Sequence, residues 1–106
     1  MKFKMGAFQI RNTANGKIFV GSSVNLDAIW NRHKLQLELG SHPNAALQND
    51  WKQYGAESFK YEILDVIVEK ETETRDYPRE VKTLEEMYLE KLQPYAEKGY
   101  NIKTGS

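Results

Sequence analysis

Two short runs of alternating apolar and polar residues open the chain and predict a pair of antiparallel strands. Phe8 and Ile10 share one face of the first run, residues 7–12, because side chains alternate along a strand. The second run covers residues 17–21. The dipeptide Asn15-Gly16 lies between the runs and is typical of the tight turns that join hairpin strands. The pattern therefore predicts a β-hairpin.

A glycine lies near an aromatic residue at the outer end of each run. Gly6 precedes Phe8 by two positions, and Gly21 follows Phe19 by two positions. Glycine inside a strand usually marks a bulge or a place where another group comes close to the backbone. The pattern leaves two interpretations open: a bulge or a tight helix crossing, or a functional site.

Directly after the hairpin, residues 25–39 have apolar positions at the spacing of one helix face. Apolar or inward-facing positions recur there at intervals of four, three and four, at Leu26, Trp30, His33 and Leu37. Asn25 is a suitable N-terminal cap, and Gly40 is a suitable C-terminal stop. We therefore expect an amphipathic helix with His33 on its inner face.

The remaining sequence predicts a second helix over 44–54, a third strand over 58–66 and a third helix over 81–92. Between the last two, eight of the twelve residues in 69–80 are charged and Pro78 interrupts the run, so we expect a solvated loop or a frayed helix there. The order β-β-α-α-β-α predicts a small α/β sandwich of the α+β type with antiparallel sheet.

The composition is that of one globular domain, and we treat residues 1–106 as a single unit with one core. No apolar run approaches the roughly 20 residues that cross a bilayer, and the first residues lack the apolar segment of a signal peptide. The sequence has no cysteine, which excludes disulfides and thiolate chemistry. We expect a cytoplasmic protein with no membrane partner.

The net charge is zero, but the charges are distributed unevenly. Residues 1–60 hold 8 Lys+Arg and 4 Asp+Glu, a balance of +4, whereas residues 61–106 hold 7 and 11, a balance of −4. A basic half can face an anionic partner, although an ordinary mixed surface gives the same counts.

Three ionisable residues are candidates for chemistry. Glu85 shares a face of the third predicted helix with Val81 and Tyr88, so its carboxylate must be paired or bind a metal; a lysine salt bridge is the simpler alternative. Neither His33 nor His42 has a second histidine four residues on, so no preformed zinc site is visible. The sequence also lacks the phosphate-binding and nucleophile-elbow glycine motifs, which argues against a nucleotide cofactor and against acyl transfer.

The order and spacing of these residues resemble the GIY-YIG endonuclease domain. The resemblance covers about residues 6–102 and includes Gly6-Ala7-Phe8, Phe19-Val20-Gly21, Leu26-x-x-x-Trp30-x-x-His33, His42-Pro43-Asn44, Glu85-x-x-Tyr88-Leu89 and Tyr100-Asn101-Ile102. It implies a small central three-stranded antiparallel sheet flanked by helices. It also implies hydrolysis of DNA phosphodiesters with one divalent cation, Mg²⁺ or Mn²⁺.

The resemblance also implies roles for single residues. Glu85 corresponds to the glutamate that holds the metal, His33 to an assisting histidine, and Asn101 to an asparagine that completes the pocket. The family further uses two tyrosines, which activate or orient the water and support its hydrogen bonds. An arginine stabilises the charge that develops on the phosphate.

The sequence departs from the family pattern at three of these positions. Phe8 and Phe19 stand at the two tyrosine positions, and Ile29 stands at the arginine position. A phenyl ring cannot donate, accept or lose a proton, and isoleucine cannot neutralise a phosphate. Positioned acid–base groups are typically worth roughly 10² to 10⁴ in rate and one electrostatic donor roughly 10² to 10³. Losing about three orders of magnitude leaves cleavage barely detectable.

Three interpretations follow: a degenerate domain with weak or no hydrolysis, an active metal-dependent DNA endonuclease with a rearranged site, and a protein-interaction or structural module on the same scaffold. In the second, Arg32 reaches the phosphate from one helical turn after Ile29. Any DNA binding is expected to be weak and non-specific, because the chain has no room for a separate target-binding region. Its expected contacts are Lys17, Arg32, Lys34 and His42. We also expect one cleft lined by Phe8, Phe19, Ile29, His33 and Glu85.

Overall fold

The computed structural model describes residues 4–67 and 76–102, which form a three-stranded sheet and three α-helices. In chain order the elements are β1 (Met5–Asn12), β2 (Ile18–Ser23), α1 (Leu26–Leu39), α2 (Ala45–Tyr54), a 3-10 turn (Ala56–Ser58), β3 (Phe59–Ile67), α3 (Tyr77–Leu92) and a second 3-10 turn (Ala96–Lys98). The β-β-α-α-β-α order predicted from the sequence is confirmed.

The sheet is antiparallel throughout, with strand order β2-β1-β3. The central strand β1 pairs with β2 through Phe8 opposite Gly21 and Ile10 opposite Phe19. On its other side, Ile10 of β1 pairs with Tyr61 of β3. Since paired residues point to the same face, Phe8, Phe19 and Tyr61 lie on one side of the sheet.

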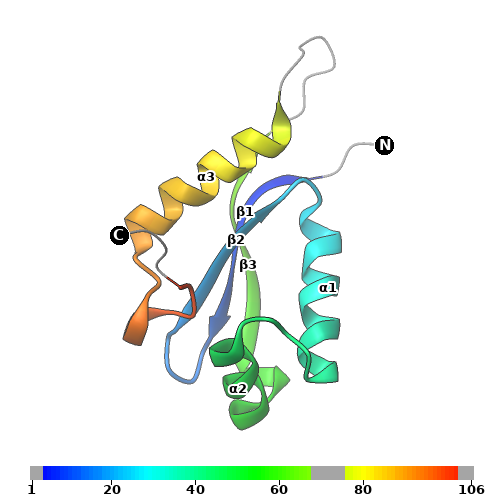
Figure 1. Cartoon of the computed structure of the whole chain (residues 1–106), viewed down its shortest axis with the longest axis vertical. Helices are drawn as coiled ribbons and strands as arrows, with labels where there is room; N and C mark the ends of the chain where they lie inside the picture. Colours follow the sequence, from blue (N-terminus) through cyan, green and yellow to red (C-terminus); the bar gives the residue numbers. More distant parts are fainter. Residues whose placement is uncertain (1–3, 68–75, 103–106) are drawn as a thin grey trace.

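The helices cover opposite faces of this sheet (Figure 1). One face packs on α1 and α2 in a core that includes Phe8, Ile10, Leu26, Leu37, Leu47, Trp51, Phe59 and Tyr100. Helix α3 packs against β1 and β2 on the other face, where Val20 and Val81 are buried. Strand β2 is therefore an edge strand that lies between α3 and α1, and the candidate site is built around it.

Local sequence signals account for the helix boundaries. The Asn25 side chain accepts a hydrogen bond from Ala28 N at 3.1 Å, which caps α1, and Gly40 ends α1 in the left-handed conformation with φ 76°. Asn44 caps α2 in the same way by accepting from Leu47 N at 3.0 Å. These caps confirm the boundaries expected for the first two helices.

Helix α3 begins four residues earlier than the sequence pattern predicts. Asp76 is its N-terminal cap and accepts from Arg79 N at 3.2 Å, and Pro78 lies in the first turn. Proline is tolerated there because its missing N–H has no partner within the helix. The expectation that Pro78 interrupts this segment is wrong, and the part of the charged run over 69–75 lies outside the described residues.

The two glycines of the hairpin both mark close approaches. A side chain at Gly6 would collide with the backbone of Asp65 on β3, and a Cβ at Gly21 would lie 2.6 Å from Cζ of Phe8. Both neighbours belong to the sheet rather than to a crossing helix, and the register between β1 and β3 shifts between Ala7 and Phe8, as expected for a bulge. In the described parts of the chain, no helix is long and apolar enough to cross a membrane.

Candidate active site

Two phenylalanines and a histidine form an aromatic cluster beneath α1. The ring of His33 lies 5.7 Å from that of Phe8 and 5.6 Å from that of Phe19, measured between centroids. Phe8 comes from β1, Phe19 from β2 and His33 from the inner face of α1, as the apolar stripe of that helix predicts. The fold thus brings three of the six sequence-predicted catalytic positions into contact.

Phe8 belongs to the core rather than to an open surface. Its side chain is only 1% exposed, and its ring ends against the backbone of Gly21 on the edge strand. Tyr61 contacts the same ring at 5.3 Å, but its hydroxyl donates to Leu26 O at 2.6 Å, and burial raises its pKa to about 12. The hydroxyl of Tyr61, next to Phe8, is therefore already hydrogen-bonded to the carbonyl of Leu26 in α1.

Ile29, at the position of the family's arginine, also packs as an apolar residue. It is partly buried against the core cluster on α1. Arg32, one turn further along the helix, is exposed, and its positive charge contributes to a lowered pKa of His33. The guanidinium therefore lies within electrostatic reach of the His33 ring.

A pair of histidines joins α1 to the loop before α2. Nδ1 of His33 lies 2.8 Å from Nε2 of His42, and Nδ1 of His42 accepts a hydrogen bond from Asn44 N at 3.0 Å. Since Asn44 N–H must donate, His42 carries its proton on Nε2 and donates it to His33. Neutral His33 then carries its own proton on Nε2. The chain of bonds fixes which nitrogen of His33 holds a proton.

Burial keeps this pair neutral at neutral pH. It lowers the pKa of His33 from 6.5 to about 4, with smaller contributions from the charges of His42 and Arg32. Burial also lowers the pKa of His42, which is 7% exposed. His42 was expected to contact nucleic acid; in the structure its ring supports His33 from within the domain.

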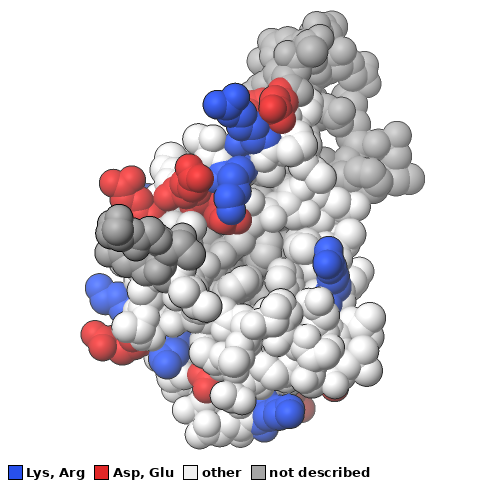
Figure 2. Space-filling view, viewed as in Figure 1, with Lys and Arg blue, Asp and Glu red and all other residues white. Residues whose placement is uncertain are grey.

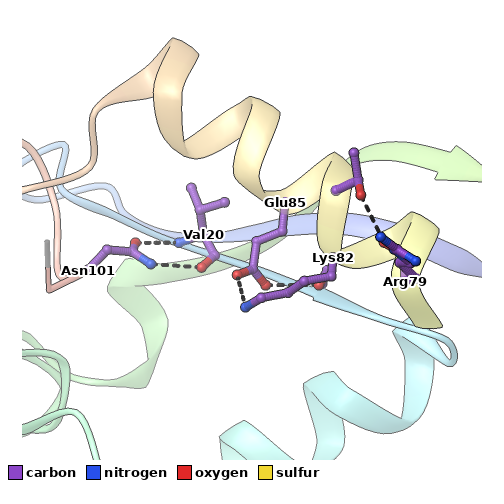
Figure 3. Close-up of polar contacts among 7 residues, drawn as sticks. Val20, Arg79, Lys82, Glu85 and Asn101 are labelled. Atoms are coloured by element: carbon purple, nitrogen blue, oxygen red, sulfur yellow. Dashed lines mark hydrogen bonds and ion pairs between the residues drawn. The ribbon is translucent and has the colours of Figure 1, made fainter. Parts of the chain in front are cut away.

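Asn101 lies against the open edge of β2 and completes its hydrogen bonding (Figure 3). Its Oδ1 accepts from Val20 N at 2.8 Å, and its Nδ2 donates to Val20 O at 2.9 Å. Next to it, Tyr100 N donates to Ile18 O at 2.8 Å. The C-terminal segment therefore meets the edge of β2 at an isolated parallel bridge between Ile18 and Gly99 and through the side chain of Asn101, which satisfies the backbone polar groups of Val20.

Glu85 projects from α3 toward β2 (Figure 3). Its Oε1 accepts from the hydroxyl of Ser22 at 2.8 Å, and its Oε2 pairs with Nζ of Lys82 at 2.8 Å. The Glu85 side chain is 15% exposed, whereas the Lys82 side chain is 63% exposed. The paired carboxylate expected from the helix pattern is confirmed, with a lysine as one of its two partners.

The candidate residues fall into two groups that both contact the edge strand β2: the aromatic cluster with His33 on the α1 side, and Glu85 with its partners on the α3 side. Phe19 belongs to the α1 face, while Ser22, which binds Glu85, belongs to the α3 face, because side chains alternate along a strand. Among the described residues, the hydrogen bonds and ring contacts above connect each group to β2 and not to the other group. This differs from the expected single cleft, and Phe8 is buried rather than part of a cleft wall.

The expected cationic contacts come from two parts of the chain, the hairpin loop for Lys17 and α1 for Arg32 and Lys34. Lys17 lies over the Tyr100 ring at 5.8 Å and Lys34 over the Trp30 ring at 5.6 Å, while Arg32 is exposed. On the face that Figure 2 shows, basic and acidic side chains lie together over α3, and other charges are scattered. Three separate cations therefore remain available.

The oxygen donors at Glu85 suit a hard divalent cation. Mg²⁺ and Mn²⁺ prefer carboxylate, hydroxyl and water oxygens, and Mg²⁺ usually keeps several waters while it uses one or two protein carboxylates. Across residues 4–67 and 76–102, no group of three or more His, Cys, Asp or Glu side chains could hold a metal. The residues present fit a cation held by Glu85 and completed by water and substrate oxygens.

Sequence reasoning raised a lysine salt bridge to Glu85 but named neither Lys82 nor Ser22 as its partner. Ser22 is 63 residues away in the chain, so no local pattern connects the two residues. Lys82 precedes Glu85 by three residues in a helix, a spacing that places side chains next to each other and could have identified the pair.

Comparison with known proteins identifies the family. A sequence model described as the GIY-YIG catalytic domain matches residues 4–101. Intron-associated endonuclease 1 of Enterobacteria phage T4 is 37% identical over 75 residues, and the match takes in 64% of this chain and 30% of that protein. The chain therefore corresponds to less than a third of the curated relative.

Two solved structures share the whole fold. The catalytic domain of homing endonuclease I-TevI is 31% identical with a TM-score of 0.77, and the match covers 95% of this chain and 100% of that one. A mutant of the catalytic domain of intron endonuclease I-TevI is 29% identical with a TM-score of 0.78 over 98% of both chains. Matched along almost its entire length in sequence and in fold, this chain belongs to the GIY-YIG catalytic domain family.

Proposed function

We propose that this chain is a GIY-YIG nuclease domain in which hydrolysis of DNA phosphodiesters is weak or lost, while weak, non-specific nucleic-acid binding remains. The observation that carries the proposal is the packing of Phe8 and Ile29. Phe8 is 1% exposed and Ile29 packs against the core cluster, so two positions where the family places polar groups serve the core here.

The chemical consequence concerns both the nucleophile and the phosphate. Water must lose a proton as it attacks, and Phe8 and Phe19 offer no group that could orient it or accept that proton. The phosphate gains negative charge in the transition state, and Ile29 cannot offset it. These losses do not multiply cleanly, because catalytic groups act as a unit, but together they remove about three orders of magnitude in rate.

Other groups at the site keep their polar character. Glu85 is held by Ser22 and Lys82, and Asn101 stabilises the edge strand that carries Ser22. His33 is neutral and presents a proton on Nε2, so it can donate a hydrogen bond to a phosphate oxygen. A divalent cation at Glu85 would supply positive charge to the phosphate and lower the pKa of a bound water.

Binding of nucleic acid would depend on dispersed positive charges. Lys17, Arg32 and Lys34 are separate cations on the hairpin turn and α1, and the chain as a whole has no net charge. Contacts of this kind neutralise phosphates and release counterions without reading bases. We therefore propose weak, salt-sensitive and sequence-independent binding to DNA.

A second candidate is an active metal-dependent endonuclease with a rearranged site. Arg32 favours it, because its charge affects His33 and could reach the phosphate that the family's arginine would contact. This arrangement replaces the phosphate clamp but not the two missing hydroxyls.

A nuclease assay separates the two candidates. The protein, its Glu85→Ala variant and an Arg32→Gln variant are incubated with supercoiled, branched and single-stranded DNA in Mg²⁺ or Mn²⁺, and binding is measured in parallel by fluorescence anisotropy at low and high salt. The proposal predicts salt-sensitive binding without cleavage above the Glu85→Ala background. Cleavage that both substitutions reduce would establish the rearranged nuclease. Absence of binding at low salt would favour a protein-interaction module.

A further inference from the structure

A protein cation already occupies the outer side of the Glu85 carboxylate. Nζ of Lys82 lies 2.8 Å from Oε2, and the hydroxyl of Ser22 binds Oε1 at the same distance. The Lys82 side chain is 63% exposed and the Glu85 side chain 15% exposed, so the ammonium lies between the carboxylate and solvent. Figure 3 shows the lysine running beside Glu85 along the same turn of α3.

The ammonium and a divalent cation would bind the same carboxylate. A cation bound at Glu85 requires at least one free carboxylate lone pair and space for several waters. Lys82 fills this position with three N–H donors and a full positive charge, and Glu85 raises the pKa of Lys82, so the ammonium stays protonated at neutral pH.

We propose that Lys82 is a tethered competitor for the metal at Glu85: its ammonium holds one carboxylate oxygen and repels any divalent cation that binds beside it. The inference rests on the proposed role of Glu85 as the cation ligand. Lys82 has a second acidic neighbour, since the charge of Glu86 also raises its pKa.

The size of the effect follows from Coulomb's law. Two unit charges 4 Å apart repel by about 1 kcal/mol in bulk water, and a divalent ion next to an ammonium by roughly twice that. Lys82 is largely exposed, so the water value applies. Removing its charge should tighten divalent binding on the order of five- to thirtyfold, which is the conversion of about 1–2 kcal/mol.

The competition can be measured without DNA and without catalysis. Mn²⁺ alone is titrated into the protein, and free Mn²⁺ is followed by electron paramagnetic resonance. The variants are Lys82→Gln, which removes the charge, Lys82→Arg, which keeps it, and Lys91→Gln as a matched control. Lys91 lies on α3 over the ring of Tyr88, so the control removes the same charge from the same helix away from Glu85.

The proposal predicts that Lys82→Gln binds Mn²⁺ five- to thirtyfold more tightly, while Lys82→Arg and Lys91→Gln stay within about twofold of the unmodified protein. Equal tightening in Lys91→Gln would overturn it, because the effect would then be one of net charge. Unchanged affinity in Lys82→Gln would also overturn it.

The Glu85→Ala background separates this inference from the proposed metal site. If Lys82→Gln tightens binding and Glu85→Ala abolishes the gain, both the competition and the role of Glu85 are supported. If Lys82→Gln has no effect while Glu85→Ala still removes binding, the competition is wrong and the metal site stands. If Lys82→Gln/Glu85→Ala binds as tightly as Lys82→Gln, Glu85 is not the ligand and both statements fail.

Discussion

Nδ1 of His33 lies 2.8 Å from Nε2 of His42, and the contact needs exactly one proton between the two rings. Asn44 N donates to the far nitrogen of His42, so that proton belongs to His42. Adding a second proton would place two N–H groups against each other in a largely buried pair. The hydrogen bond between His33 and His42 therefore requires both imidazoles to be neutral, and protonation should destabilise the fold.

This pair predicts an acid-sensitive fold. Because the pKa of His33 falls from 6.5 to about 4 on folding, the unfolded chain binds a proton below pH 6.5 that the native protein does not. Stability is therefore fully present above pH 6.5 and falls as the pH drops toward 4. After allowing for solvent screening, the free energy of unfolding should fall by about 1 kcal/mol between pH 7 and pH 5.

Urea denaturation at the two pH values measures this slope, and His33→Gln is the test variant. Glutamine keeps a polar group but does not titrate, so the slope assigned to His33 should disappear. An unchanged slope in His33→Gln would show that other groups cause the acid sensitivity.

Asn101 should contribute to stability whether or not the domain cleaves DNA. Asn101→Ala removes the two hydrogen bonds to Val20 N and O, at 2.8 and 2.9 Å, that complete the edge of β2. Each net hydrogen bond is worth about 0.5–1.5 kcal/mol, so the loss should be about 1–3 kcal/mol in urea denaturation. Asn31→Ala, on the exposed surface of α1, is the control and should change stability by less than about 0.5 kcal/mol. Equal losses in the two variants would contradict this role of Asn101 at the edge of β2.

Gly21 and Phe8 should be energetically coupled. A Cβ at Gly21 would lie 2.6 Å from Cζ of Phe8, so Gly21→Ala should cost about 1–3 kcal/mol through overpacking. Phe8→Leu removes the clashing end of the ring, and in this background the cost of Gly21→Ala should fall. A double-mutant cycle measured by denaturation gives the coupling, which we expect to exceed about 0.5 kcal/mol. Strictly additive effects would show that the two residues do not meet.

Local rules predict most of the fold. The caps at Asn25 and Asn44 and the stop at Gly40 each depend on a few adjacent residues, and the structure has all three in place. The predicted hairpin also forms, but residues 13–17 connect its strands as a longer loop rather than as a tight Asn15-Gly16 turn. The start of α3 differs from the prediction because proline is tolerated in the first turn of a helix, where its missing N–H has no partner within the helix.

Local sequence rules do not predict the contacts within the candidate site. The contact between Ser22 and Glu85 joins residues 63 positions apart, and it exists only because α3 packs on β2. The burial of His42 likewise depends on the loop before α2 folding onto α1, which no periodicity encodes. The sequence therefore identifies candidate site residues, whereas the residues that bind them can be found only from the three-dimensional structure.

Activity should be restored only in part, and only by several changes together. Phe8→Tyr and Phe19→Tyr return two hydroxyls to rings already in place, and Ile29→Arg returns a charge to α1. No single replacement should help much, because water activation and charge stabilisation are both missing. Since Phe8 and Ile29 are packed, the triple variant should lose about 1–3 kcal/mol of stability, and circular dichroism must show that it is folded.

The triple variant should nick supercoiled DNA in Mg²⁺ or Mn²⁺, and adding Glu85→Ala should abolish the nicking. A folded triple variant that binds DNA yet remains inert would show that the defect lies beyond these three side chains.

Cleavage by the unmodified protein tests the central claim most directly. Supercoiled plasmid is incubated with excess protein in Mn²⁺, and the first-order rate of nicking is compared with that of Glu85→Ala under the same conditions. We predict rates that cannot be distinguished, because Phe8, Phe19 and Ile29 leave the attacking water and the phosphate without their polar partners. Nicking by the unmodified protein that Glu85→Ala stops would contradict this account and establish an active nuclease.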